Sequence, residues 1–209
     1  MKKNACFFSI FLLFFMTVPV QSQAIPVELM TGYRYLTINL VVSKSFTETS
    51  KFGFFHMNTI GVDYDNKEEN DFSMQDLLTY EPLNNFRLTG GAFYGKPGFK
   101  PTMGIQYLVT GKKLFILIAP RVNIESDPAY DIFSIIQFKA PLTENTKLYT
   151  RLQLLNLFDS NGNIKSYQWF RLGLEIKGIQ FGAAFNLDEF GTDPQVQYNA
   201  GLFIRREIF

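Results

Sequence analysis

The stretch IQFGAAFNLD, residues 179–188, carries an apolar residue at almost every second position. Ile179 and Phe181 share one face, whereas Gln180 and Asn186 share the other. This period of two is typical of a β-strand, whose successive side chains point to opposite faces. A helix would instead repeat its apolar residues at i, i+3 and i+4. The stretch therefore predicts a strand with one apolar and one polar face.

The same alternation recurs along most of the chain. It is clearest in Lys147–Phe158 and Gln168–Lys177, and is present with a mixed second face in Lys113–Ile124. The segment lengths are near the 10 or so residues that a tilted membrane strand needs. Seven weaker strands are predicted at Tyr33–Ser45, Phe52–Tyr64, Gln75–Leu83, Phe86–Gly95, Pro101–Thr110, Tyr130–Ala140 and Val196–Phe209.

These segments make an odd number of strands, whereas single-chain bacterial barrels use even numbers. Ile25–Met30, which turns at Thr31-Gly32, supplies a first strand and raises the count to twelve. The alternative is ten strands, with Gln75–Gly95 read as one strand across Asn84-Asn85. We favour twelve.

The first 24 residues predict a cleaved signal peptide. Lys2 and Lys3 precede an apolar run over residues 7–20, and Ser22-Gln23-Ala24 has the small-x-small form of a cleavage site. The run falls short of the roughly 20 residues that a bilayer-spanning helix needs. Cys6, the only cysteine, precedes the run, whereas an acylated cysteine would follow it. Residues 1–24 are thus expected to be a leader and residues 25–209 a single domain.

The composition narrows the class of protein. The formal net charge of +1 becomes about −1 without Lys2 and Lys3, which does not favour nucleic-acid binding. No segment after the leader has 18 consecutive apolar residues, which excludes a helical membrane protein on pattern. An export signal followed by aromatic, alternating strands predicts an all-β fold. We expect a single transmembrane, antiparallel up-and-down β-barrel in the outer membrane, in contact with its lipids and lipopolysaccharide.

The links between the predicted strands give an orientation. Tight links near Thr47–Ser50, Asn84-Asn85, Gly111-Lys112, Thr143–Thr146 and Gly178 alternate with longer ones at Asp65–Met74, Lys96–Lys100, Glu125–Ala129, Asp159–Lys165 and Glu189–Gln195. Short periplasmic turns and longer external loops are expected to alternate in this way.

The polar faces of the strands carry charges of both signs. On the predicted registers the residues facing the lumen are Arg121, Asp131, Lys139, Arg151, Arg171, Glu175, Lys177 and Asp188. One interpretation is a network of paired charges that fills a narrow barrel, because unpaired burial would be costly. The other is a water-filled pore for small solutes, whose arginines bias it toward anions. The sequence leaves both open.

The final strand resembles that of outer-membrane barrels, which typically end in alternating apolar residues and a terminal Phe. Here Leu202, Ile204 and Ile208 share one register, and Phe209 joins it only if a bulge lies at Arg205-Arg206. The resemblance implies that Phe209 is the membrane-insertion signal read by the barrel-insertion machinery. The length, tight turns and Phe-rich strands are similar to those of small outer-membrane proteins of the Bacteroidota, a group without an established activity to transfer.

Two features of the sequence are candidates for a catalytic site and a metal site. Outer-membrane acyl hydrolases place a catalytic His two residues before a Ser on one strand, but the corresponding pair here is His56 and Asn58. The nucleophile is missing, so a non-enzymatic barrel is favoured over a lipid hydrolase centred on His56. The acidic stretch Asp63–Asp71 is read as a solvated loop, and no metal or cofactor is predicted. A soluble periplasmic ligand-binding barrel is a further alternative.

Overall fold

The computed structural model describes residues 25–208 as one closed antiparallel barrel. The signal peptide expected over residues 1–24 and the insertion signal expected at Phe209 lie outside the described residues. The twelve strands are β1 (Ile25–Gly32), β2 (Tyr35–Ser45), β3 (Phe52–Asp63), β4 (Asp71–Leu83), β5 (Phe86–Gly95), β6 (Gly98–Thr110), β7 (Leu114–Asn123), β8 (Tyr130–Pro141), β9 (Thr146–Asp159), β10 (Gly162–Ile176), β11 (Ile179–Phe190) and β12 (Gln195–Ile208).

Each strand pairs with its neighbours in sequence, and β1 pairs with β12 to close the barrel. The closing pairs run from Ile25 opposite Ile208 to Gly32 opposite Gly201. Closure leaves no strand edge unpaired, which is the condition for a sheet that crosses a membrane. The predicted all-β, up-and-down barrel with twelve strands is therefore confirmed.

The choice between ten and twelve strands was decided at Asn84-Asn85. The two asparagines form the turn between β4 and β5, and Asn85 has a φ of 70°. Asparagine tolerates the left-handed region better than most residues, which makes it a common turn residue. The first strand, expected over Ile25–Met30, is β1.

The two faces of each strand have the polarity that the sequence predicted. On β11, Phe181 and Phe185 are exposed on the outside, whereas Gln180 and Asn186 are buried inside. The outer surface of the barrel is rich in exposed Phe, Leu and Ile side chains, and the interior holds most of the buried polar and charged ones. The barrel thus has the inverse polarity of a soluble protein.

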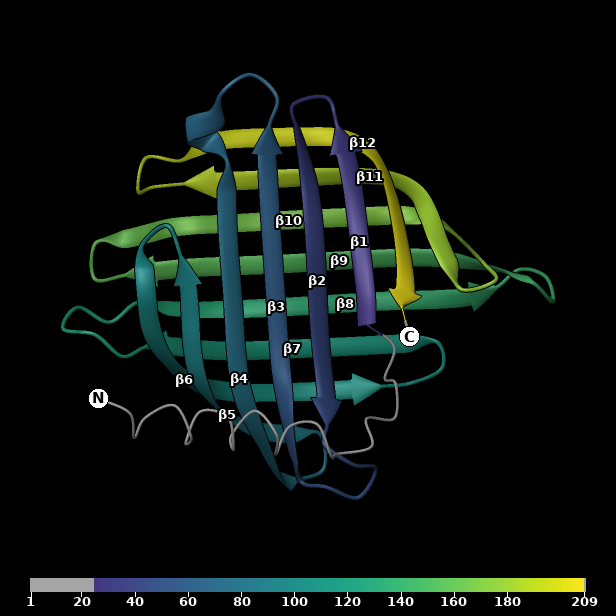
Figure 1. Cartoon of the computed structure of the whole chain (residues 1–209), viewed down its shortest axis with the longest axis horizontal. Helices are drawn as coiled ribbons and strands as arrows, with labels where there is room; N and C mark the ends of the chain where they lie inside the picture. The colour runs from purple at the N-terminus through teal and green to yellow at the C-terminus, as the bar shows by residue number, and fades with distance from the viewer. Residues whose placement is uncertain (1–24, 209) are drawn as a thin grey trace, which may run out of the picture.

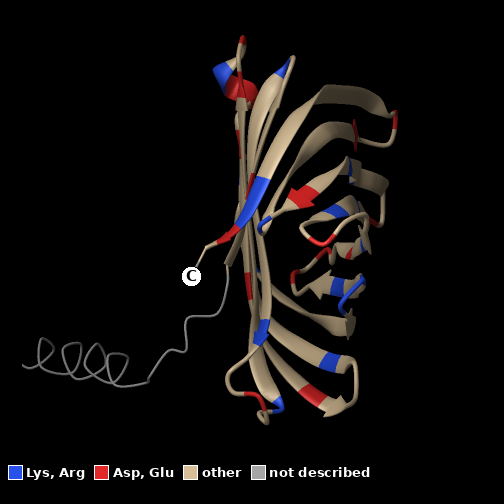
Figure 2. Ribbon diagram, turned by 90° about the vertical axis from the view of Figure 1, so that its right-hand side faces the viewer, with Lys and Arg blue, Asp and Glu red and all other residues tan. Residues whose placement is uncertain are grey.

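The barrel is flattened, so that its two walls face each other closely. In Figure 1, β1 to β4 cross in front of β7 to β11 at a steep angle, and Figure 2 shows the same barrel turned by 90°. Phe55 on β3 and Phe133 on β8 belong to strands that are far apart in the ring, yet their ring centroids are 6.2 Å apart. Side chains from opposite walls therefore meet inside the barrel.

Three glycines lie where the backbones of neighbouring strands approach closely. Gly173, Gly182 and Gly201 lie on β10, β11 and β12, and a Cβ atom on any of them would lie within 2.3 Å of a backbone carbonyl oxygen. Gly173 is paired with Gly182, and Gly201 with Gly32. Glycine is the residue that permits such a close approach of neighbouring backbones.

Two predictions about the connections were wrong. The links expected to be long at Lys96–Lys100 and Asp159–Lys165 are two-residue turns, because the ladders continue to Gly98 and Gly162. The link between β2 and β3 is longer than expected, spanning residues 46–51. Short and long connections therefore do not alternate strictly. The longest connection, residues 64–70, contains the short 3₁₀ helix η1 (Lys67–Glu69).

The bulge at Arg205-Arg206 that would bring Phe209 into register with Ile208 is not present in the described part of β12. The pairing with β1 runs without a register shift from Gly201 to Ile208. Leu202, Ile204 and Ile208 are exposed on the outside, as the sequence pattern indicated, and Arg205 points inward.

Candidate functional site

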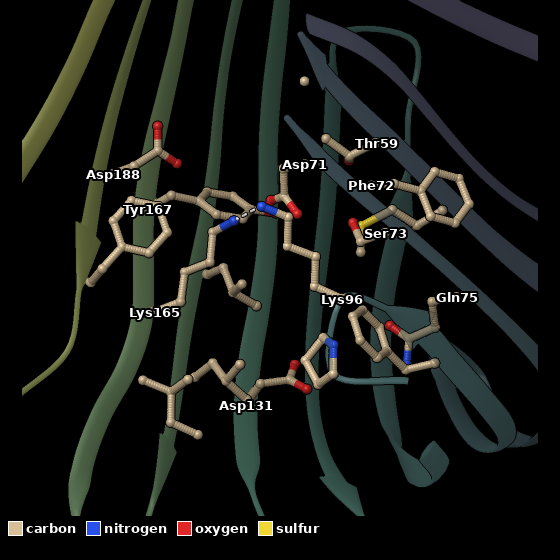
Figure 3. Close-up of a pocket in the computed structure, with 18 of the residues that line it drawn as sticks. Thr59, Asp71, Phe72, Ser73, Gln75, Lys96, Asp131, Lys165, Tyr167 and Asp188 are labelled. Carbon is tan, nitrogen blue, oxygen red and sulfur yellow. Dashed lines mark hydrogen bonds and ion pairs between the residues drawn. The ribbon is translucent and has the colours of Figure 1, made fainter. Parts of the chain in front are cut away.

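A cavity of about 530 Å³ occupies one end of the barrel lumen. This end, which we call the mouth, lies where β1, β3, β5, β7, β9 and β11 are followed by their connections. Ile25 and Ile208, the first and last described residues, lie at the other end, which we call the termini end. Figure 3 shows the lining of the cavity, which includes Asp71, Lys96, Asp131, Lys165 and Asp188. A cavity of this size is within the range of small-molecule sites.

An ion pair spans the cavity from wall to wall. Lys165 Nζ on β10 lies 2.8 Å from Asp71 Oδ2 on β4, and the two strands are on opposite sides of the ring (Figure 3). The same ammonium lies 5.1 Å from the ring centroid of Phe190. The pair therefore ties the two walls together just inside the mouth.

A second group of charged side chains connects the turns around the mouth. Arg34, in the turn between β1 and β2, binds Glu69 of η1 at 2.5 Å and Asp63 at 3.3 Å. Partial burial alone would lower the pKa of Arg34, but the hydrogen bonds to Glu69 and Asp63 outweigh it and raise the pKa above its ordinary value. Asp63 also accepts backbone N–H groups of Asp65 and Asn66. The acidic stretch is thus organised by these contacts.

Hydrogen-bonded carboxylates surround the deeper part of the cavity. Asp188 accepts hydrogen bonds from the Tyr35 hydroxyl at 2.7 Å and from Trp169 Nε1 at 3.2 Å. Asp131 accepts one from Arg121 Nε at 2.7 Å. Both carboxylates are buried, so this pairing is what makes their burial tolerable.

Below the cavity the lumen is closed by an apolar layer. We define the apolar constriction as six packed side chains contributed by β3, β4, β7 and β8: Phe55, Leu77, Leu117, Ala119, Phe133 and Ile135. Phe55, Leu117 and Phe133 are all 0% exposed, so no water contacts their side chains. Arg121 lies over the Phe133 ring at 5.4 Å and also bonds Gln75 across the lumen. The lumen is therefore filled at this level.

Beyond the constriction lies a second charged layer, the arginine cluster, made of Arg151, Arg171, Arg205 and Glu28. Glu28 Oε1 accepts from Arg171 Nε at 2.9 Å, and Oε2 accepts from Arg151 Nη1 at 3.2 Å. Arg205 faces Glu28 in the β1–β12 register, but its Nη1 has no hydrogen-bond partner among the described residues. Three buried guanidinium groups thus share one carboxylate, which leaves an excess of positive charge in the lumen.

The structure places seven of the eight residues expected in the lumen on inward-facing strand positions. Arg121, Asp131, Arg151, Arg171 and Asp188 belong to the layers described above. Glu175 binds Lys139 at 2.5 Å and Lys147 at 2.8 Å near the termini end. Charges of both signs are therefore paired inside the barrel.

Lys177 was wrongly placed in the lumen. It is exposed in the turn between β10 and β11, with a φ of 50°, and Gly178 follows with a φ of 80°. Two consecutive residues with positive φ form the tight turn that fits the twist of paired strands. The alternation ends at Ile176, one residue earlier than the sequence suggested.

Sequence reasoning missed Glu28 and Arg205. Glu28 shares its face with Pro26 and Met30, so the pattern of β1 did not mark that face as polar. Arg205 was assigned to a bulge. The only signal for either residue was its position in an alternating strand, which becomes useful once β1 and β12 are known to pair.

His56 faces away from the lumen. Its Nδ1 lies 2.7 Å from Asp76 Oδ1, the carboxylate opposite it on β4. Asn58 is on the same outer face, whereas Thr59 lines the mouth cavity. The arrangement expected for an acyl hydrolase, a His beside a Ser, is therefore replaced here by a His-Asp pair beside an Asn.

Residues 25–208 contain no cluster of three or more His, Cys, Asp or Glu side chains that could hold a metal ion. Within the same residues there is no helix of sufficient length and apolarity to span a bilayer.

The comparison with solved structures identifies the fold. No protein-family model and no curated protein matches the chain. A KdgM porin in complex with disordered oligogalacturonate is similar over 90% of this chain and 100% of its own, with 9% identity and a TM-score of 0.51. A NanC porin is similar over 89% of this chain and 99% of its own, with 11% identity and a TM-score of 0.51. At these identities the chain shares a barrel fold with porins.

Proposed function

We propose that this protein is an integral outer-membrane β-barrel that acts, without enzymatic activity, as a narrow passive channel. The observation that carries the proposal is the distribution of polarity, with an apolar outer surface around a lumen lined by charged and polar side chains. A soluble ligand-binding barrel would have the opposite distribution. The fold shared with porins supports the same assignment.

The proposal includes the route to the membrane. A leader over residues 1–24 would direct export, and Phe209 would be read by the barrel-insertion machinery. The mouth would face outward, toward lipopolysaccharide, and the termini would lie in the periplasm. Kinship with small outer-membrane proteins of the Bacteroidota is part of this proposal.

The apolar constriction would act as the gate of the channel. An apolar segment in a narrow pore excludes water and therefore ions, so a small outward movement of its side chains opens or closes the path. Phe55 and Phe133 come from opposite walls and meet in this layer. Arg121, held by Asp131 and stacked on Phe133, would keep the gate closed.

Truncating the gate is expected to open it. The double variant Phe55→Ala and Phe133→Ala removes two rings from the constriction, and we expect it to conduct ions in a planar lipid bilayer at voltages where the wild-type channel is mostly closed. The measurement is the single-channel current in potassium chloride.

The control is Phe185→Ala, which removes a ring from the outer surface and is expected to leave the current unchanged. Both variants are first checked for the folded barrel by heat-modifiable migration on SDS gels. A folded double variant with no current would contradict the channel.

The arginine cluster predicts the sign of the selectivity. Arg205→Gln removes one positive charge without breaking a hydrogen bond among the described residues. In the gate-opened background we expect the reversal potential in a salt gradient to shift toward cations. Arg206→Gln is the matched control, because Arg206 is the next residue on β12 and faces outward. Equal shifts for the two variants would exclude a selective role for the cluster.

A structural role in the membrane is the second candidate function. The filled lumen favours it, since the buried side chains and their ion pairs would stiffen a barrel that carries no flow. The gate-opened variant separates the two functions, because a purely structural barrel need not hold a continuous path behind the constriction.

A further inference from the structure

The outer surface of the barrel carries one hydrogen-bonded His-Asp pair in the middle of an otherwise apolar wall. We define the outer patch as His56 and Asn58 on β3, Asp76 on β4, and Gly90 and Ala92 on β5. The outward-facing residues around it on the same wall are all apolar: Ile38, Leu40, Val42, Phe54, Ile60, Met74, Leu78, Leu88, Met103 and Ile105.

The patch lies midway between two aromatic belts. Phe72 packs against Tyr94 toward the mouth, and Phe52 packs against Tyr80 toward the termini end. Asp76 is four residues from both Phe72 and Tyr80 on β4, which corresponds to about 13 Å of strand on either side. In the membrane orientation proposed above, Asp76 would lie near the middle of the hydrocarbon layer, where charges are costly.

The hydrogen bond within the patch uses only one of the two polar side-chain atoms of His56 and of Asp76. His56 Nδ1 and Asp76 Oδ1 are 2.7 Å apart, yet the Asp76 side chain is 60% exposed and that of His56 28%. Among residues 25–208, neither Asp76 Oδ2 nor His56 Nε2 has a hydrogen-bond partner. Lipid chains cannot supply one.

The small residues on this part of the outer wall permit another molecule to approach its backbone closely. Ala92 is the neighbour of Asp76 on β5, and Gly90 is the neighbour of Leu78. A Cβ at Gly90 would meet no atom within 4 Å, so this part of the wall is open. Small residues of this kind let two backbones pack closely inside a membrane.

We propose that the outer patch binds a second copy of this chain, a proposal that rests on the membrane insertion argued above. Two copies with the same orientation in a membrane are related by a two-fold axis along its normal. Each residue then meets the partner at its own depth. His56 and Asp76 are cross-strand partners and lie at similar depth. The patch is therefore self-complementary: a doubly protonated His56 can donate its Nδ1–H to Asp76 of its own chain and its Nε2–H to Asp76 Oδ2 of the other copy.

Cysteine cross-linking in outer membranes tests the contact. The chain has a single cysteine, Cys6, in the expected leader, so an introduced thiol is expected to be the only one in the mature protein. Ala92 lies one and a half strand spacings from an axis between β3 and β4, so the two Ala92→Cys thiols would be about 14 Å apart. A bis-maleimide cross-linker that spans this distance is expected to link them into a dimer. The matched control is Ala183→Cys, an outward alanine on β11, six strands away in the ring, which is expected to stay monomeric.

A second variant tests whether the His56 and Asp76 side chains hold the dimer together. It adds His56→Leu and Asp76→Leu to Ala92→Cys. We expect about ten-fold weaker association, which is the effect of losing two hydrogen bonds within a membrane. Leucine suits a lipid-facing position, so the barrel should still fold. Equal cross-linking of Ala92→Cys and Ala183→Cys, or no effect of the double variant, would overturn the proposal.

Membrane insertion is measured separately from the contact. Heat-modifiable protein that is found in the outer-membrane fraction but does not cross-link would refute the dimer alone. Protein that extracts without detergent would refute the proposed function.

Discussion

Replacing Gly182 by alanine is expected to destabilise the folded barrel strongly. The added Cβ would lie 2.3 Å from the carbonyl oxygen of Leu172 and 2.5 Å from the Cα of Gly173, both on β10. These are backbone atoms in a continuous ladder, so no side-chain rotation relieves the clash. Forcing such strands apart costs about 3 kcal/mol, or about a hundred-fold in the ratio of folded to unfolded protein.

The measurement is the fraction of protein that shows heat-modifiable migration after refolding into lipid vesicles. Gly90→Ala is the control, because a Cβ at Gly90 meets nothing within 4 Å and points outward. If Gly182→Ala folds as well as Gly90→Ala, the close approach of β10 and β11 is not required for the flattened barrel.

Replacing Glu28 by glutamine is expected to be the most destabilising change among the lumen charges. Glu28 is 2% exposed and binds Arg151 and Arg171, with Arg205 opposite it. The substitution keeps the shape of the side chain but removes the only carboxylate of the arginine cluster. Breaking a buried ion pair by removing one partner costs about 3–5 kcal/mol, because it leaves uncompensated charge.

Urea-induced unfolding from lipid vesicles measures this change in the free energy of unfolding. Glu207→Gln on β12, an exposed carboxylate near the same end, is expected to change it by less than about 0.5 kcal/mol. Adding Arg171→Gln to Glu28→Gln should recover part of the loss, because it removes one of the unbalanced charges. Absence of any recovery would mean that packing, and not charge, determines the effect.

Together with the cross-linking experiment, these variants probe three different surfaces of one sheet. The glycine substitution acts on the close approach of two backbones, the glutamate substitution on the lumen, and the leucine double variant on the outer patch. The outer patch shares no hydrogen-bond or ion-pair partner with the lumen sites, so the effect of the leucine double variant on stability should be nearly additive with theirs.

The sequence by itself determined where most strands lie and the face that most of their side chains take, and it narrowed the number of strands to ten or twelve. Alternation such as that of residues 179–188 is a local property of the sequence. Because successive side chains of a strand point to opposite faces, this alternation puts polar side chains on one face and apolar side chains on the other. The even number of strands in a barrel left ten and twelve open, and the turn at Asn84-Asn85 in the structure decided for twelve. The limits of this reasoning lay at strand ends, as Lys177 illustrates.

Only the tertiary structure decided which side chains meet across the lumen. Phe55 and Phe133, or Lys165 and Asp71, come from opposite walls of the flattened barrel and meet only because the sheet closes on itself. The curvature that closes and flattens a sheet leaves no period in the sequence. The closed constriction, the role of Glu28 and the position of His56 at mid-height on the outer wall all follow from that curvature and register. The alternation set only the face of each residue.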